Sequence, residues 1–394
     1  MALTPAARNK LSILAETDFR GKRVTFGIKQ QDRLSHTYII GKTGTGKSTL
    51  LELLIRQDIA SGRGLALLDP HGDLAERVLG SIPPERAGDV IYFNVPDREH
   101  PLGFNPLEGV APQRRALAAA GLLEVFRNLW SDSWGPRLEH ILRNALLALF
   151  DQPQATLADV LRLFSDPSFR KQVAVVTTNE QVRDFWLREF DSYPARLQAE
   201  AVAPIQNKVG AFLADPVLNR IVTREKSAFK FRQLMDDGRV LLVNLAKGQV
   251  GEGTASLLGS MLVSRMSLAA LNRAEIPESN RRPFFIYLDE FHSFHTSSLN
   301  TLLSESRKYG VGLILAHQYL SQLAQPITDA VLGNAGTIIA FRVGPQDTEI
   351  LSREFQPEFT ARDLLNLPNH HIYLKLMIDG RISRPFSART RMDP

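Results

Sequence analysis

The sequence predicts an α/β fold with a mostly parallel sheet and an all-α insertion domain. Near both ends of the chain, short apolar runs alternate with helical segments, as in parallel sheets covered by helices on both faces. Between residues 113 and 235, apolar residues instead recur at three-and-four spacing, and no convincing strand interrupts them. We therefore predict a lead-in and the first part of the core over 1–112, the insertion over 113–235, and the second part of the core over 236–394.

The first core segment is predicted to begin with a strand pair over residues 19–30, turned at Gly21-Lys22. A helix over 47–60 is expected to end at Ser61-Gly62, because glycine commonly terminates helices. Buried strands are predicted on either side of this helix, at 36–40, 65–68 and 90–95. Recurring prolines from Pro96 to Pro112 then mark a connector into the insertion.

Helical periodicity in the insertion is clearest over residues 114–129, 136–150 and 194–213. The second core segment returns to alternating elements, with helices predicted over 254–272 and around 299–309. Its strands are predicted at 240–246, 284–288, 312–316 and 337–342. The chain is expected to end in a β-hairpin over 372–378 and 382–386, because Asp379-Gly380 is a favoured two-residue turn.

The composition indicates a globular protein, with 44% hydrophobic and 23% charged residues among 394, and excludes a disordered or collagen-like chain. A net charge of +5 favours nucleic acid among the partners only weakly. No cysteine is present, which excludes disulfides and thiolate sites and fits a reducing cytoplasm. The most apolar long stretch, 255–271, carries Arg265 and several serines, and residues 1–10 lack a signal-peptide core. We expect a cytoplasmic protein without membrane insertion.

Residues 41–48 read G-K-T-G-T-G-K-S and match the phosphate-loop pattern G-x-x-x-x-G-K-[ST] in full. Glycines let the backbone approach phosphates closely, and the following helix N-terminus favours anions. Lys47 would neutralise the β- and γ-phosphates of ATP, and the Ser48 hydroxyl would ligate Mg²⁺. The expected nucleotide-binding residues are Gly41, Thr43, Gly44, Thr45, Gly46, Lys47, Ser48 and Thr49.

Two carboxylates follow the predicted strand 284–288. Asp289 would hold Mg²⁺ through water, and Glu290 would polarise the water that attacks the γ-phosphate. The alternative interpretation is that both residues are solvated acids at a strand end, but the phosphate loop elsewhere in the sequence favours a site. Gln318, beyond the strand 312–316, could sense the γ-phosphate, or it could simply be a solvated strand end. The adjacent glutamate favours hydrolysis over a passive nucleotide switch.

Three further patterns point less strongly to a site. Residues 289–292 read D-E-F-H, like the D-E-x-H box of two-lobed helicases, but no second phosphate-loop lobe is found. His292 and His295 have H-x-x-H spacing without the H-E-x-x-H order of zincins, so structural histidines are favoured over a metal site. Residues 207–210 read N-K-V-G, which lacks the aspartate of the guanine-reading N-K-x-D motif and favours ATP over GTP.

Taken in order, these motifs resemble the HerA/FtsK superfamily of hexameric translocases, and within it the TraD/TraG-type coupling proteins of conjugative type IV secretion. The segments that carry the resemblance are 41–48, 67–73, 103–107, 240–258, 288–291, 307–318 and 339–347. The resemblance implies a RecA-like P-loop ATPase core, a hexameric ring with ATP between neighbouring subunits, and DNA through its centre.

The resemblance also suggests roles for residues outside the nucleotide loop. Arg342, and second Arg307, are candidates for an arginine that reaches the next subunit's γ-phosphate, although a surface or salt-bridge role is as plausible for either. The predicted loop 247–253 could contact DNA phosphates through Lys247, or it could be a connector. The insertion resembles the all-α domain of coupling proteins and could dock a protein partner. Such proteins usually begin with transmembrane helices, which we do not find here.

The sequence therefore favours an ATP-driven DNA translocase, and two alternatives stay open. One is an ATPase whose cargo or partner is protein, as in a secretion motor or a defence complex built around a nuclease; hydrolysis without DNA stimulation would distinguish it. The other is a nucleotide-gated scaffold with tight ATP binding and negligible turnover, which Glu290 argues against.

Overall fold

The computed structural model describes residues 11–18, 23–130, 134–294 and 296–391. Within them lies an 11-stranded sheet in the order β2-β1-β13-β10-β9-β3-β8-β7-β4-β6-β5, beside a two-stranded hairpin of β11 and β12. The strands are β1 (Leu11–Thr17), β2 (Thr25–Lys29), β3 (Thr37–Ile40), β4 (Gly64–Asp69), β5 (Val90–Asn94), β6 (Val240–Asn244), β7 (Phe284–Leu288), β8 (Val311–His317), β9 (Thr337–Ala340), β10 (His371–Lys375), β11 (Met377–Ile378), β12 (Arg381–Ile382) and β13 (Phe386–Thr390).

From β9 to β5 every neighbouring pair of strands is parallel, whereas β10, β13, β1 and β2 continue the sheet with antiparallel pairing. The strands β3, β4, β6, β7 and β8 are buried along their whole length. Strands buried on both faces read as unbroken apolar runs, which is why the sequence predicted them. The predicted α/β fold with a mostly parallel sheet is confirmed.

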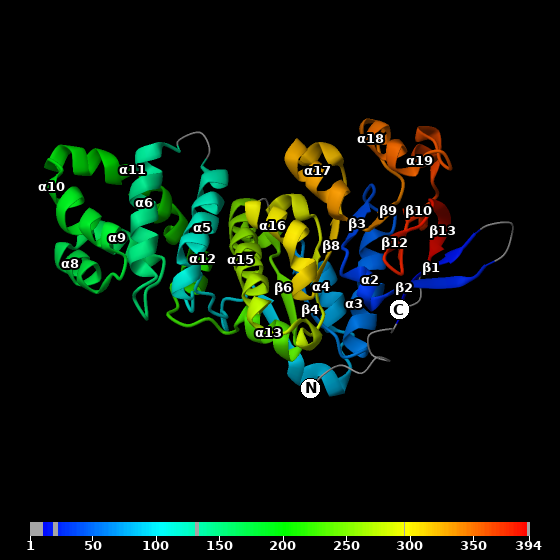
Figure 1. Cartoon of the computed structure of the whole chain (residues 1–394), viewed down its shortest axis with the longest axis horizontal. Helices are drawn as coiled ribbons and strands as arrows, with labels where there is room; N and C mark the ends of the chain where they lie inside the picture. Colours follow the sequence, from blue (N-terminus) through cyan, green and yellow to red (C-terminus); the bar gives the residue numbers. More distant parts are fainter. Residues whose placement is uncertain (1–10, 19–22, 131–133, 295, 392–394) are drawn as a thin grey trace.

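Helices cover both faces of this sheet (Figure 1). Alternate residues of β3 separate into two cores, with Ile39 facing α3 and α4 and with Tyr38 and Ile40 facing α15 and α16. The core helices are α2 (Gln30–Arg33), α3 (Lys47–Ala60), α4 (Asp73–Leu79), α14 (Lys247–Val250), α15 (Glu252–Asn272), α16 (Ser297–Glu305), α17 (Gln325–Asn334), α18 (Pro345–Phe355) and α19 (Ala361–Asn366). The predicted helix 47–60 is confirmed at both ends.

Between β5 and β6, the described residues form helices and no strand. Figure 1 shows most of these helices at one end of an elongated molecule, with the β1–β2 pair near the other end. They are α5 (Arg115–Leu129), α6 (Pro136–Leu149), α7 (Ala158–Ser165), α8 (Pro167–Val176), α9 (Glu180–Asp184), α10 (Phe190–Ser192), α11 (Ala195–Ala214), α12 (Pro216–Val222) and α13 (Phe231–Asp237). Helix α5 packs against α15 and joins the helical segment to the core. The boundaries at 113 and 235 stay a prediction.

The stretch that includes α15 is apolar and long enough to cross a membrane, and among the described helices no other passes that test. Spanning Glu252–Glu275, it has 89% of its most apolar window buried inside the protein. Its contacts with α5, α16 and α13 make it the central helix of one layer. Its apolarity is therefore explained by burial in the protein core.

The lead-in and the C-terminus differ from expectation in detail. Strand β1 begins at Leu11, before the predicted strand pair, and the predicted turn Gly21-Lys22 lies outside the described residues. Strand β1 pairs with β2, which follows it closely, and with β13 at the other end of the chain, and the second pairing has no local signal. The hairpin turn is confirmed, with Asp379 and Gly380 both at positive φ between β11 and β12. Its first strand breaks at Leu376, so that β10 pairs with β9 and β13 instead.

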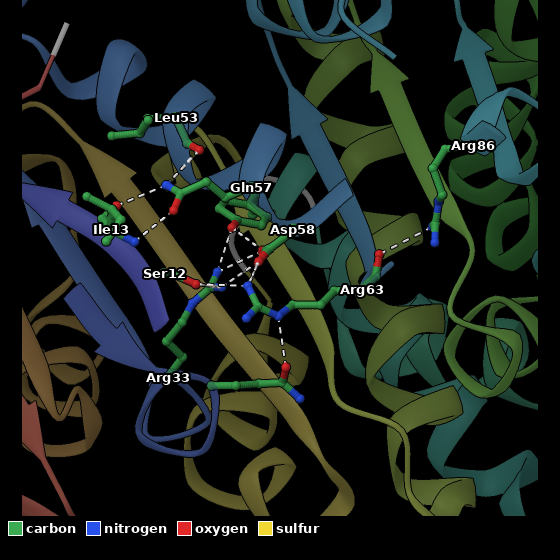
Figure 2. Close-up of polar contacts among 10 residues, drawn as sticks. Ser12, Ile13, Arg33, Leu53, Gln57, Asp58, Arg63 and Arg86 are labelled. Atoms are coloured by element: carbon green, nitrogen blue, oxygen red, sulfur yellow. Dashed lines mark hydrogen bonds and ion pairs between the residues drawn. The ribbon is translucent and has the colours of Figure 1, made fainter. Parts of the chain in front are cut away.

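A buried ion-pair network ties the lead-in to α3 (Figure 2). The carboxylate of Asp58 on α3 accepts hydrogen bonds from Arg33 at 2.5 and 2.8 Å and from Arg63 at 2.9 Å. Tyr287 on β7 also donates its hydroxyl to Asp58 at 2.6 Å. Burial alone would raise the pKa of Asp58, but Arg33 and the other donors outweigh burial and hold it below its usual value. The network therefore keeps a negative charge inside the core.

We expect Asp58→Asn to lower the free energy of unfolding by about 3 kcal/mol, because it leaves Arg33 buried without its counter-charge. Urea denaturation at neutral pH measures this change. Since the folded pKa of Asp58 is depressed, its stabilisation is present above pH of about 4 and is lost as the pH falls further. The matched control is Glu349→Gln, which breaks the exposed Glu349–Arg353 pair and should change stability by less than about 0.5 kcal/mol. Equal effects of the two variants would contradict this account.

Candidate functional site

The phosphate loop leaves the carboxyl end of β3 and enters α3. Gly44 and Gly46 have φ of 76° and 118°, a backbone region that only glycine adopts easily. The Lys47 ammonium donates to the carbonyl oxygens of Gly41 at 2.5 Å and Lys42 at 3.2 Å, so it lies under the loop. Burial lowers the pKa of Lys47, and the carboxylates of Glu290 and Asp289 offset part of that effect.

The loop is also held from the far side by the segment that precedes β10. The backbone N–H of His370 donates to the carbonyl of Thr45 at 2.8 Å. A Cβ atom on Gly46 would lie 2.9 Å from Nδ1 of His370 and 3.1 Å from the ring of Phe341. Sequence reasoning missed His370, because nothing local signals that it packs on a loop more than 300 residues earlier.

Asp289 and Glu290 follow β7 at the same edge of the sheet. Asp289 is buried, and burial raises its pKa to about 7, helped by the negative charges of Asp69 and Glu290 and opposed by Lys47. Three carboxylates therefore face one ammonium in a small space. This excess of negative charge fits a site that receives a cation.

Glu290 has a strained backbone, and its carboxylate is hydrogen-bonded to Gln318. Its φ is 45°, which is uncommon for a residue with a side chain and recurs at active sites. Oε1 of Glu290 accepts a hydrogen bond from Nε2 of Gln318 at 2.7 Å. Oε1 of Gln318 accepts in turn from the Thr43 hydroxyl at 2.8 Å. The acid, the amide and the phosphate loop are thereby joined in one chain of hydrogen bonds.

A cleft of about 390 Å³ collects these groups. Its lining includes Thr43, Gly44, Gly46, Lys47, Ser48 and Thr49 from the loop and α3, together with Asp289, Glu290 and Gln318. The sequence had placed all of these in one site. Gly41 and Thr45 belong to the same loop, where Gly41 accepts from Lys47 and Thr45 is anchored by His370.

Asp69, at the end of β4, is a cleft residue that sequence reasoning left without a role. Its carboxylate accepts from the backbone N–H groups of His71 at 2.9 Å, Leu74 at 2.8 Å and Ala75 at 3.0 Å, and so caps α4. The polar run D-P-H-G-D after a buried strand was the available signal. His71, Asp73, Arg77 and His370 also line the cleft.

The two candidate arginines lie at opposite ends of the parallel strands, Arg342 after the carboxyl end of β9 and Arg307 before the amino end of β8. Arg342 follows β9 beside the phosphate loop, where its carbonyl accepts from the N–H of Lys42 at 2.9 Å. Its guanidinium donates to the carbonyl of Leu367 and to Asn369 Oδ1, at 3.2 and 2.9 Å. Arg307 is exposed in the turn before β8, at the edge away from the cleft. Neither guanidinium lines the cleft of its own chain.

The predicted loop 247–253 is partly helical, because Lys247–Val250 forms the single turn of α14. The N–H of Lys247 donates to the carbonyl of Pro70 at 2.8 Å, and this bond fixes the turn against the end of β4. Lys247 lines a second pocket of about 330 Å³, between α5, α15 and His292. His295, the other histidine of the H-x-x-H pattern, lies outside the described residues. Among those described, no cluster of three or more His, Asp or Glu could hold a metal ion by itself.

Residues 24–355 match the profile of the type IV secretion-system coupling protein DNA-binding domain. The chain belongs to this family. No curated protein matches the sequence significantly. The match runs from just before β2 to the end of α18.

Solved structures of similar proteins show the same fold. Plasmid coupling protein TrwB with a non-hydrolysable ATP analogue has a TM-score of 0.65 at 18% identity, over 99% of this chain and 91% of that one. TrwB with ADP and Mg²⁺ has a TM-score of 0.64 at 19% identity, over the same shares. VirB4 of Thermoanaerobacter pseudethanolicus has a TM-score of 0.63 at 15% identity, over 97% and 96%. The fold is a RecA-like P-loop ATPase with a helical insertion, as predicted.

We expect Gly46→Ala to lower the free energy of unfolding by about 3 kcal/mol, because the new methyl group meets His370 in an already unfavourable backbone conformation. Gly44→Ala is the matched control: Gly44 also has positive φ, but nothing lies within 4 Å of an added Cβ. The control should lose only about 1 kcal/mol. Urea denaturation of both variants measures the difference. Similar losses would show that His370 does not restrain the loop.

Proposed function

We propose that this protein is a Mg²⁺-dependent ATPase that moves DNA, working as a hexameric ring with ATP bound between subunits. The observation that carries the proposal is the hydrogen-bonded chain from Thr43 through Gln318 to Glu290, in the cleft that also holds Lys47 and Asp289. A buried carboxylate beside a phosphate loop can activate water, which a site built only to bind nucleotide does not need. The family's DNA-binding description supports the choice of cargo.

In this proposal the phosphate loop binds the nucleotide. The residues Gly41, Thr43, Gly44, Thr45, Gly46, Lys47, Ser48 and Thr49 surround the phosphates. Lys47 supplies the positive charge, and Ser48 and Asp289 hold Mg²⁺, with Asp289 acting through water. The raised pKa of Asp289 fits this role, because a carboxylate crowded by burial, Asp69 and Glu290 gains from a nearby cation. When bound, Mg²⁺ would neutralise charge between the β- and γ-phosphates.

Glu290 acts on the attacking water as general base, and Gln318 touches both Glu290 and the loop. Because the amide oxygen of Gln318 accepts from Thr43 and its amide nitrogen donates to Glu290, the orientation of the amide depends on what lies between Thr43 and Glu290. This arrangement supports its role as the γ-phosphate sensor. The strained backbone of Glu290 aims the carboxylate into the cleft, away from the extended course of β7.

Arg342 is the better candidate for the arginine that acts in trans. It lies at the cleft edge of the sheet but its guanidinium is directed to Leu367 and Asn369 of its own chain, outside the cleft. Arg307, exposed at the other edge, is the second candidate. For DNA, we propose contact through Lys247, which is among the residues of the second pocket beside α5. The helical segment 113–235 is the proposed surface for a protein partner.

We expect duplex or single-stranded DNA to stimulate ATP hydrolysis several-fold at low salt, with the stimulation falling steeply as salt rises, because phosphate contacts release counterions. Glu290→Gln should bind ATP within about threefold of the wild type and lose at least about 100-fold in kcat, since it removes the base and keeps the shape. Phosphate release and equilibrium binding of a fluorescent ATP analogue measure both quantities.

The matched control for Glu290→Gln is Glu305→Gln, a half-buried acid at the end of α16 and outside the cleft, which should leave kcat unchanged. Wild-type turnover in Glu290→Gln would remove the proposed base. Hydrolysis indifferent to DNA would remove the DNA motor and turn the search to a protein partner on the helical segment. ATP binding without turnover in the wild type would indicate a scaffold.

We expect Arg342→Ala to lower kcat by about 1,000-fold while ATP binding stays within about threefold, because an arginine that acts in trans stabilises charge during transfer. Mixing Arg342→Ala subunits with Glu290→Gln subunits should restore part of the activity. At some interfaces an intact Glu290 then meets an intact Arg342 from its neighbour. Failure of the mixture to recover would exclude action in trans, and Arg307→Ala serves as the comparison.

A further inference from the structure

His292 lies two residues beyond Glu290, in the short helical turn Phe291–Phe294. Its Nδ1 is 3.4 Å from Oε2 of Glu290. Both atoms are buried, and neither makes a hydrogen bond of good geometry to any described residue. The other carboxylate oxygen, Oε1, already accepts from Gln318 at 2.7 Å. His292 is therefore the nearby donor for the oxygen of Glu290 that Gln318 does not reach.

Gln322 fixes which nitrogen of His292 carries the proton. Oε1 of Gln322 accepts from the backbone N–H of Tyr319 at 3.3 Å, which assigns the amide orientation. Nε2 of Gln322 then faces Nε2 of His292, at 3.3 Å. An amide NH₂ group can only donate, so Nε2 of a neutral imidazole must accept and Nδ1 must carry the hydrogen. That hydrogen is therefore on the ring nitrogen that lies 3.4 Å from Oε2 of Glu290.

The surroundings also keep the imidazole neutral. Burial lowers the pKa of His292, and the positive charge of Lys247 adds to this effect, against opposing contributions from Glu290 and Glu252. A neutral ring has one donor and one acceptor, which is what Glu290 and Gln322 require. Residues 318–322 thus contact both oxygens of the Glu290 carboxylate, one directly through Gln318 and the other through Gln322 and His292.

We propose that His292 is a positioning residue for Glu290, donating its Nδ1–H to Oε2, so that His292 and Gln318 together fix the plane of the carboxylate that receives the proton of the attacking water. The inference rests on the proposed role of Glu290 as the base. His292 also lines the pocket of about 330 Å³ that holds Lys247, whereas Glu290 lines the nucleotide cleft. His292 therefore lies between the pocket beside α5 and the nucleotide cleft. It contacts Glu290 from the side of the cleft that faces the helical segment.

Three substitutions at His292 distinguish a positioning role from general support of the fold. His292→Ala should lower kcat by about 10- to 100-fold with KM and ATP affinity within about threefold, because one hydrogen bond to a charged group is lost. His292→Asn places an amide N–H near the position of Nδ1 and should restore at least a third of the wild-type kcat. His292→Gln, whose amide reaches the position of Nε2, should behave like the alanine variant.

Two kinetic results would overturn the proposal. One is wild-type kcat in His292→Ala, and the other is equal activity of the asparagine and glutamine variants. Thermal denaturation of all three shows whether they fold. A purely structural histidine would change stability without separating asparagine from glutamine.

The tautomer gives a second test that does not depend on hydrolysis. Long-range ¹H–¹⁵N correlation NMR on histidine-labelled full-length protein, assigned by the His292→Asn variant, should show the Nδ1–H form for His292. An Nε2–H tautomer at neutral pH would overturn the proposal even where the alanine and glutamine variants fail to fold. If the wild type hydrolyses no ATP, the proposed function fails, and the NMR result still decides whether His292 can donate to Glu290.

Discussion

The parallel register of β3, β4, β7 and β8 is the constraint on which the site depends. Because parallel strands end at the same edge of a sheet, the phosphate loop, Asp69, the Asp289–Glu290 pair and Gln318 meet there, although the helical segment separates them along the chain. Alternate side chains of these strands pack into two different cores, so a slip of one residue would exchange the side chains of the two cores and displace every polar tip. Packing of the sheet and chemistry at its edge are therefore specified by the same register.

That edge collects charge which the fold itself does not neutralise. Asp69 is satisfied by three backbone N–H groups, but Asp289 is buried near two other carboxylates, and burial with those charges raises its pKa to about 7. In the buried network of the core, by contrast, Asp58 forms ion pairs with Arg33 and Arg63, and its pKa is lowered. One buried carboxylate has its cations within the chain, whereas the other lies where a metal ion and a nucleotide would supply the counter-charge. This difference supports the proposed role of Asp289 and indicates a structural role for Asp58.

Much of the core and of the cleft could be predicted from local sequence. The helix 47–60, the strand 284–288 and the turn Asp379-Gly380 have strong local signals, and the loop motif fixes most of the cleft. What could not be predicted depends on contacts between distant segments. The pairing of β1 with β13 joins the two ends of the chain, and His370 contacts a loop more than 300 residues earlier. Helices α17, α18 and α19 contain no recognisable motif. The proposed role of His292 depends on its contact with Gln322, which follows a different strand.

The position of Glu290 explains how its strained backbone can be kept. The φ of 45° at Glu290 costs free energy, which contacts around the residue must offset. Here the Glu290 carboxylate lies between Gln318 on one side and His292 on the other. Both partners are held by the segment after β8, since Gln322 orients His292 and is itself bonded to Tyr319. Glu290 therefore depends on the end of β8 more than on its own strand. A movement of that segment would change both oxygens of the carboxylate together, which makes the end of β8 the natural place for the nucleotide cleft and the pocket beside α5 to influence each other.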